Sequence, residues 1–298
     1  MAIKVTRGII TRPQKVVMYG PEGIGKTTLA SEAPEPLFID TEGGTAHLNV
    51  ARIECEKDWE SLLATIKDVA KEDCCKTLVI DTIDWAEQLA SDYICKRFKQ
   101  PSIESFGYGK GYTYLAEEIE RFLSALDEVI ASGKNVILTA HAKMRKQELP
   151  DEAGQFDRWE LKLTKQSAPL VKEWADAVLF INYKTMIVAT EGANKAQGGK
   201  RVIYTTHHPC WDAKNRHGLA DCLDLNYENI ASIFSSSGTP VKGELRTLME
   251  KDGVTEEQLR ELLSTSKFYD ASKPLEDYSD KLISQWQIIV TKIQNTIF

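Results

Sequence analysis

The chain has 298 residues, of which 42% are hydrophobic and 27% are charged, and its formal net charge is −7. These proportions are ordinary for a globular protein, and no apolar run approaches the ~20 residues of a membrane span. The negative charge excludes a protein that coats nucleic acid by bulk charge, although it leaves room for a local basic channel. The six cysteines form no C-x-x-C pair and no secretory signal is visible, so we expect reduced thiols and a cytoplasmic protein.

Short apolar runs alternate with amphipathic helical patterns along the first part of the chain. The runs are 14–19, 36–40, 77–81, 135–140 and 177–182. They are continuously apolar, as strands are at the centre of a parallel sheet that is covered on both faces. The helical patterns between them, such as 59–69 and 115–130, each have one apolar face. The sequence therefore predicts an α/β fold with three layers and a mainly parallel sheet.

The pattern changes after residue 185. Two apolar runs around the polar stretch 191–199 predict a β-hairpin with a longer loop. Ser, Gly and Pro at 235–240 predict a boundary between a core domain, 1–235, and a small helical C-terminal module, 236–298. In that module T-E-E-Q predicts a capping box, and the apolar stripe of the last helix predicts the core of a small bundle.

The sequence GPEGIGKT at 20–27 fits the phosphate-binding pattern G-x-x-x-x-G-K-[ST], with a predicted strand before it and a helix after it. Its glycines let consecutive backbone N–H groups face phosphate oxygens. Lys26 is predicted to reach the β- and γ-phosphates of ATP, and Thr27 to ligate Mg²⁺. The predicted nucleotide contacts are Gly20, Pro21, Glu22, Gly23, Ile24, Gly25, Lys26, Thr27 and Thr28.

Three later strands end in polar residues. Asp81 ends the run TLVID and is predicted to hold Mg²⁺. Thr82 follows it where many ATPases have a water-activating Glu, so we expect the base to be Glu42, with Glu87 as a reserve. The other interpretation of Glu42 is a surface loop residue. His141, after VILTA, is predicted to sense the γ-phosphate. The other interpretation is a residue at a strand end whose hydrogen-bonding groups are satisfied within the protein.

This order of motifs resembles the RecA-type ATPase core over roughly residues 10–235. FIDTEGG resembles the strand with the catalytic Glu, and TLVIDTID the Mg²⁺-site strand, although His141 stands where RecA has Gln. The segments GPEGIGKTTLA, SFGYGKGY and AKNRHGL are similar to segments of small RecA-like ATPases from phage recombination modules, of the single-strand annealing type. The resemblance implies ATP, Mg²⁺, single-stranded DNA, a homo-oligomeric ring or filament, and the host cytoplasm if the gene belongs to a phage.

Two segments resemble the DNA-binding loops of this family, SFGYGKGY and LTAHAKMRK. Aromatic side chains suit stacking on unpaired bases, and cations suit phosphates. The resulting DNA-binding candidates are Phe106, Tyr108, Lys110, Lys143, Arg145 and Lys146. We expect the last three to begin a long polar loop that ends near Asp157. Three further cations are predicted to add a basic element, namely Lys195, Lys200 and Arg201.

A Lys-x-Arg pair, Lys214 and Arg216, lies beyond the last predicted core strands. In RecA-like assemblies such a pair reaches the γ-phosphate bound by the neighbouring subunit, where it stabilises charge on the transferred phosphoryl group. The other interpretation is a solvated loop. Histidines and cysteines surround the pair, but their spacing fits no standard zinc pattern.

The resulting hypothesis is a DNA-stimulated ATPase that hydrolyses ATP to ADP and phosphate at subunit interfaces and anneals or exchanges single DNA strands. Two alternatives stay open, a ring-shaped DNA helicase or translocase motor and a nucleotide-dependent protein assembly switch. No membrane partner is expected. The C-terminal module is a candidate contact for a single-strand-binding protein.

Overall fold

The computed structural model describes residues 12–53, 58–148, 154–190, 193–235, 244–264, 282–283 and 285–296. The chain divides into two compact units, Met1–Ser237 and Gly238–Phe298. The stretch 236–243, which holds most of the predicted boundary, lies outside the described residues.

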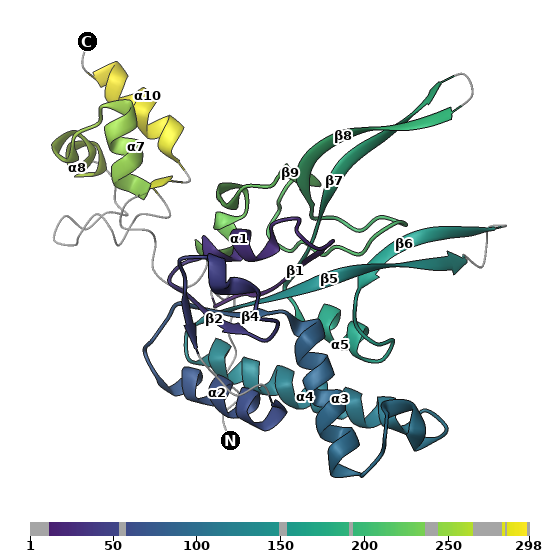
Figure 1. Ribbon diagram of the computed structural model, residues 1–298. Coiled ribbons are helices and arrows are strands. Elements are labelled where there is room, and N and C mark those ends of the chain that lie inside the picture. The colour runs from purple at the N-terminus through teal and green to yellow at the C-terminus, as the bar shows by residue number, and fades with distance from the viewer. Residues whose placement is uncertain are drawn as a thin grey trace, which may run out of the picture. The chain divides into compact units, whose positions relative to one another are not determined.

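Within the described part of the first unit, nine strands form a sheet of order β3-β2-β4-β5-β1-β7-β8-β9, with β6 paired to β5 (Figure 1). Their bounds are β1 Lys15–Gly20, β2 Pro36–Asp40, β3 Ala51–Ile53, β4 Thr77–Asp81, β5 Asn135–Glu148, β6 Gln155–Leu161, β7 Ala177–Thr190, β8 Ala193–Tyr204 and β9 Cys222–Asp224. Neighbours from β3 to β7 are parallel, whereas β5–β6, β7–β8 and β8–β9 are antiparallel. The predicted apolar runs are β1, β2, β4, β5 and β7, and the mainly parallel sheet is confirmed.

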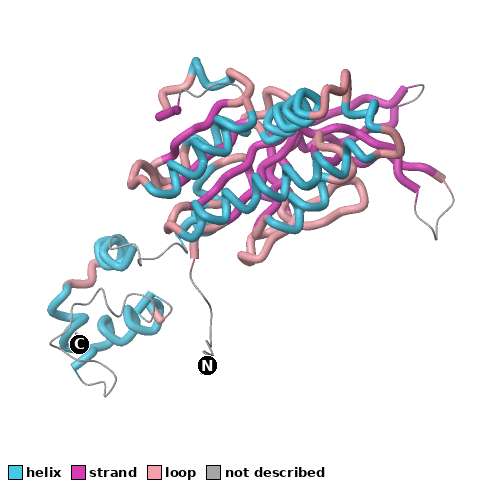
Figure 2. The backbone as a smooth tube through the Cα atoms, turned by 90° about the horizontal axis from the view of Figure 1, so that it is seen from below, coloured by secondary structure: helices cyan, strands magenta, loops and turns pink. Residues whose placement is uncertain are grey.

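Helices cover both faces of the sheet, which confirms the three-layer α/β fold (Figures 1 and 2). The helices of this unit are α1 Lys26–Ser31, η1 Gly44–His47, α2 Trp59–Lys71, α3 Ile83–Arg97, η2 Ile103–Phe106, α4 Lys110–Ala131, α5 Ser167–Trp174, η3 Tyr227–Asn229 and α6 Ala231–Ser235. The apolar faces of α2 to α5 pack on one side of the sheet, around Tyr19 and Ile80. Helices α1 and α6 pack on the other side, around Met18 and Val79. Alternate residues of the central strands therefore enter two separate cores.

Local sequence signals account for the start of helix α2 and for its buried face. The carboxylate of Asp58 accepts a hydrogen bond from the backbone N–H of Ser61, 3.0 Å away, which satisfies a donor at the first turn. The buried positions within the helix are spaced as an apolar stripe and include Leu62 and Ile66. Helix α4 shows the same pattern over five turns, so both helices lie where the sequence predicts them.

The predicted loop after Lys143 is wrong because it is a β-hairpin, whereas the hairpin predicted around residues 191–199 is confirmed with a shorter loop than expected. Strand β5 continues past the core to Glu148 and returns as β6, so the expected loop from Lys143 to Asp157 is largely strand. Strand β8 pairs with β7 from Ala193 onward, where a loop was expected up to residue 199. Both hairpins extend beyond the helical layers on the same side of the unit (Figure 1). Hydrogen bonds between the paired strands satisfy the backbone groups of these segments. Their polar side chains give a weak strand signal, so the sequence alone predicts loops there.

The second unit contains α7 Glu244–Asp252, α8 Glu256–Ser264 and α10 Trp286–Thr296. The predicted capping box is confirmed, since Thr255 N donates to Gln258 Oε1 at 2.9 Å and Gln258 N donates to Thr255 Oγ1 at 3.3 Å. The apolar stripe of α10 forms the core of this unit with Leu245 and Leu259, as predicted. None of the described helices combines the length and apolar character that crossing a membrane requires.

Candidate active site

The phosphate-binding turn joins β1 to α1 at the carboxyl end of the parallel strands. Gly20 lies where β1 approaches β7 so closely that a β-carbon would be 2.2 Å from the carbonyl oxygen of Ile181. Gly25 directly precedes α1 with a φ of 109°, a conformation that favours glycine. The backbone of the turn is therefore shaped by these glycines, whereas Ile24 is buried in the core beneath it.

Lys26 begins α1 and turns back over this loop. Its Nζ donates to the carbonyl oxygens of Gly20, at 3.1 Å, and Pro21, at 2.9 Å. Burial lowers the pKa of Lys26, while the nearby carboxylates of Asp81 and Glu42 act in the opposite direction. The site thus holds a cation at the place where phosphate charge is expected.

The strand order brings the predicted residues together. Strand β5 lies between β1 and β4, and the register pairs Gly20 with His141. A cavity of about 300 Å³ opens over these strand ends. The residues lining it are Glu22, Gly23, Gly25, Lys26, Thr27, Thr28, Glu42, Gly44, His47, Asp81, Thr82 and His141. The P-loop and the three polar strand ends, which the sequence predicted separately, therefore form one site.

Asp81 and Thr27 place a carboxylate and a hydroxyl in the lining of this cavity. The hydroxyl of Thr139 donates to Asp81 Oδ1. Burial raises the pKa of Asp81, and hydrogen bonds from Thr139 and Thr27 partly oppose this by favouring the carboxylate. A carboxylate beside a hydroxyl is a hard, all-oxygen donor set, which suits Mg²⁺. These residues fit the metal that a P-loop nucleotide site requires.

Asp40, at the end of β2, shapes the turn that presents Glu42. Its carboxylate accepts hydrogen bonds from the backbone N–H groups of Gly43, at 2.6 Å, and Thr45, at 2.8 Å. Burial opposes ionisation of Asp40, but these hydrogen bonds outweigh it and lower its pKa. Partial burial raises the pKa of Glu42 itself. A carboxylate with a raised pKa is better matched to accepting a proton near neutral pH.

His141 lies between two carboxylates. Its Nδ1 is 2.8 Å from Asp84 Oδ2, and its Nε2 is 3.9 Å from Glu42 Oε2. The backbone N–H of His141 also donates to Asp84 Oδ1, at 3.0 Å. Sequence reasoning missed Asp84 because its partner is far away in the chain, although its place in the first turn after the Asp81 strand was an available signal. The reserve base, Glu87, instead accepts hydrogen bonds from Thr164.

The first predicted DNA-binding segment consists of the end of η2, a short turn and the start of α4. Phe106 ends η2 and its ring packs against Phe98 and Tyr114, with centroids 5.6 and 5.7 Å away. Tyr108 lies in the following turn with its side chain fully exposed, and Lys110 begins α4. Of the two aromatic candidates, Tyr108 is therefore the one available to a ligand.

The second predicted segment is the β5–β6 hairpin, where each cation has a partner in the same chain. Lys143 Nζ donates to the carbonyl oxygen of a residue just beyond β6. Arg145 Nε lies 3.4 Å from Glu160 Oε2, and Lys146 Nζ lies 3.4 Å from Asp157 Oδ1. Acids on β6 thus offset the positive charge of β5.

The two cations of strand β8 whose side chains are described also have partners within the chain. Lys200 Nζ lies 2.7 Å from Asp224 Oδ2. Arg201 Nη1 donates to the carbonyl oxygen of Ile24 at 3.2 Å, so this guanidinium braces the P-loop, a contact that sequence reasoning did not foresee. The side chain of Lys195 lies outside the described residues.

The two members of the Lys-x-Arg pair have different surroundings. Lys214 Nζ donates to the backbone carbonyls of Lys172, at 3.2 Å, Glu173, at 3.2 Å, and Ala175. These use all three donors of its ammonium and cap the end of α5. The side chain of Arg216 is 62% exposed and its Nη1 lies 3.5 Å from Asp176 Oδ1.

Arg216 lies at the opposite end of the strands from the P-loop of its own chain. The backbone N–H of Asp176 donates to the carbonyl oxygen of Lys15, the first residue of β1. Gly20 is about 16 Å further along that strand, given ~3.3 Å per residue. The side chain of Arg216 is therefore remote from the cavity of its own subunit.

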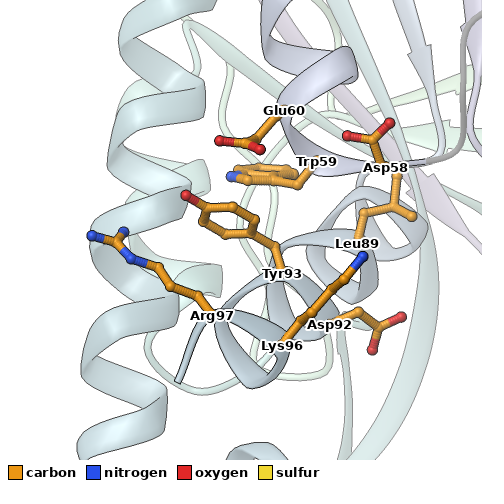
Figure 3. A pocket seen from close by; sticks show the side chains of 8 residues that line it. All are labelled: Asp58, Trp59, Glu60, Leu89, Asp92, Tyr93, Lys96 and Arg97. Carbon is orange, nitrogen blue, oxygen red and sulfur yellow. The ribbon is translucent and has the colours of Figure 1, made fainter. Parts of the chain in front are cut away.

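Two other features lie apart from the cavity. Within the described residues, no group of His, Cys, Asp and Glu is arranged to hold a metal ion, and His208 instead stacks on Trp211 with centroids 4.1 Å apart. A groove of about 590 Å³ between α2 and α3 is lined by Trp59 and Tyr93 among charged side chains (Figure 3). The indole of Trp59 donates to Glu118 at 2.7 Å, so this side chain belongs to the helical packing.

A family model and one solved structure are similar to the part of the chain that holds this site. The chain is similar to a KaiC-like protein of Pyrococcus horikoshii, with 16% identity, a TM-score of 0.38, and coverage of 65% of this chain and 79% of the other. No curated protein matches. Residues 12–217 match the family described as AAA domain, and they hold the P-loop, Glu42, Asp81 and His141. Because this match spans most of the chain, the protein belongs to the AAA domain family, and its three-layer α/β core is that of a P-loop ATPase.

Proposed function

We propose that the protein is an ATP-dependent, oligomeric single-stranded-DNA-binding recombination protein that anneals or exchanges strands. The observation that carries the ATPase chemistry is the single cavity lined by Lys26, Thr27, Asp81 and Glu42. Lys26 balances phosphate charge, and Thr27 and Asp81 would hold Mg²⁺, which would supply further charge stabilisation. Glu42 accepts the proton of the attacking water.

Hydrolysis at a subunit interface is supported by the position of Arg216. This exposed guanidinium is too far along the strands to serve its own P-loop, whereas a neighbouring copy in a ring or filament can present its cavity to it. Lys214 anchors the same loop to α5. In this proposal Arg216 contacts the phosphate of the neighbour, and Lys214 supports it.

Binding of single-stranded DNA is supported by the exposed ring of Tyr108, with Lys110 beside it, and by hairpins that extend from the nucleotide edge of the sheet. Stacking and phosphate contacts tolerate any base sequence, as annealing requires. We further propose that the helical second unit contacts a single-strand-binding protein. This contact of the second unit is independent of the ATPase chemistry of the first unit.

The paired cations of the β5–β6 hairpin favour a second candidate function. Because Arg145 and Lys146 face Glu160 and Asp157, this surface carries mixed charge, which suits a protein partner at least as well as DNA. The second candidate is therefore a nucleotide-dependent switch that binds protein and controls its assembly.

The test combines annealing of two labelled complementary strands with unwinding of a forked duplex, each with ATP, with ADP and without nucleotide. ATP-dependent annealing without unwinding supports the proposal, with Lys26→Ala as the inactive control. Unwinding identifies a helicase motor instead. Nucleotide binding with neither DNA activity favours the protein switch.

A further inference from the structure

A second cavity, of about 500 Å³, lies beside the nucleotide site. Its walls come from α3, from η2, from the first turns of α4 and from the residues that follow β6. The residues relevant here are Trp85, Gln88, Ser91, Tyr112, Lys162 and Thr164. Asp84 lines this cavity and is hydrogen-bonded to His141, which lines the nucleotide cavity, so this pair connects the two cavities.

Trp85 is the unusual member of this cavity. Its side chain is 46% exposed, and within the described residues it has no hydrogen-bond or ring partner. The other tryptophans have such partners, which are Glu118 for Trp59, Phe180 for Trp159, Asp127 for Trp174, Thr206 for Trp211 and Asp252 for Trp286. An exposed, unpartnered indole beside a cavity is a typical binding residue, because a stacked ligand removes its apolar face from water.

The wall opposite α3 is fixed in place. The buried carboxylate of Glu87 accepts hydrogen bonds from Thr164 N, at 3.1 Å, and Thr164 Oγ1, at 2.8 Å. The ammonium of Lys143 donates to the carbonyl oxygen of Leu163. These contacts tie the segment after β6 to α3 and to β5. A ligand therefore meets a preformed cavity, and little ordering opposes its binding.

The side chains that line the cavity indicate which kind of ligand it can bind. Trp85 and Tyr112 offer aromatic rings, while Gln88, Ser91 and Thr164 offer neutral hydrogen-bonding groups. Lys162 is exposed and adds a cation. A planar heteroaromatic ring with polar edges and a phosphate attached fits this combination.

We infer that an unpaired base of single-stranded DNA stacks on Trp85 in this cavity. The inference rests on the proposed function, whose DNA partner it locates on α3 in addition to the segments predicted from sequence. Trp85 directly follows Asp84, the residue that holds His141 beside Glu42. DNA at Trp85 thus binds the same helical turn that orients the nucleotide site, and it stimulates hydrolysis through that turn.

The experiment measures binding of the full chain to labelled oligodeoxythymidylate and to an abasic oligodeoxynucleotide of the same length, by fluorescence anisotropy. The wild type binds the base-containing strand more tightly. Trp85→Ala raises Kd for that strand about 5- to 150-fold and removes the preference over the abasic strand, because one stacking contact is lost. Trp85→Phe keeps an aromatic face and recovers most of the affinity.

The matched control is Tyr93→Ala, since Tyr93 is an aromatic residue of the same helix that lines the groove between α2 and α3 and not this cavity (Figure 3). It leaves the preference for bases unchanged. Trp85→Ala also loses the stimulation of ATP hydrolysis by DNA, whereas the control variant keeps it. If wild-type protein binds no single strand, the proposed function fails. If it binds and Trp85→Ala retains the preference, or if Trp85→Ala dissociates the oligomer, the inference about this cavity is wrong while DNA binding stands.

Discussion

His141 and Asp84 are joined by two hydrogen bonds, Nδ1 to Oδ2 at 2.8 Å and backbone N to Oδ1 at 3.0 Å. Both side chains are over nine-tenths buried. Burial opposes ionisation of Asp84, yet the hydrogen bonds from His141 outweigh it and lower the pKa of this carboxyl. An ionised Asp84 favours a proton on Nδ1 and directs Nε2 toward Glu42.

Asp84→Asn is expected to lower kcat for ATP hydrolysis about 10- to 100-fold, the usual effect of removing a group that orients a site residue. Nucleotide Kd should change little, because the P-loop contacts remain. The control is Asp92→Asn, an exposed acid on the same helix, which should leave kcat unchanged. Steady-state kinetics and nucleotide titration separate the two effects, and equal kcat values for both variants would contradict the role of Asp84.

Glu42→Gln should bind ATP normally and lower kcat about 10²- to 10⁴-fold, because a general base is removed. The base acts when ionised, and burial raises the pKa of Glu42, so the wild-type rate should fall as pH drops through a value above the ordinary Glu range. This limb of the pH–rate profile should be absent in the variant. A near-normal rate, or an unchanged profile, would remove Glu42 as the base.

Arg216→Ala should retain nucleotide binding and lose about 10³- to 10⁵-fold in turnover of the assembly, the range measured for such arginines acting on a neighbour. Arg216→Lys should recover little, since an ammonium lacks the planar, multi-donor geometry. Mixing Arg216→Ala with Lys26→Ala should restore part of the activity, because some interfaces then combine an intact P-loop with an intact Arg216. Mixed oligomers without any activity would show that Arg216 acts within its own subunit.

The β5–β6 hairpin offers a test in which affinity should increase. Replacing Asp157 with Asn and Glu160 with Gln frees Lys146 and Arg145 from their ion pairs. If the hairpin contacts DNA, the double variant should bind single strands more tightly, and the logarithm of its affinity should fall more steeply with salt because more counterions are released. Replacing Lys143, Arg145 and Lys146 with Ala should do the opposite. Identical salt slopes in all three proteins would place the DNA path elsewhere.

His217 should make the fold sensitive to acid. Burial lowers the pKa of His217, so the unfolded chain takes up this proton more readily than the folded chain. Stability should therefore decrease as pH falls below about 6.5, the ordinary His value. His217→Gln should flatten that decrease, as measured by urea unfolding between about pH 7.5 and 5. Parallel pH profiles for both proteins would exclude a contribution of His217.

Much of this site could be predicted from sequence because its signals are local. The P-loop needs glycines, a lysine and a threonine at fixed spacing between a strand and a helix, and each requirement is satisfied within eight residues. The central strands are continuously apolar because both faces are covered, so they are visible without any knowledge of their order. Since parallel strands end at one edge, Glu42, Asp81 and His141 could be expected there together.

The tertiary structure decided everything that depends on partners distant in the chain. Asp84 meets His141 across 57 positions, and Lys214 meets the end of α5 across 39 to 42. The β5–β6 hairpin was not predicted because its cations are matched by acids on the opposite strand, and a polar sequence alone resembles a loop. Composition and periodicity report which residues prefer burial, whereas hydrogen bonds and ion pairs depend on which side chains the fold brings within a few ångströms.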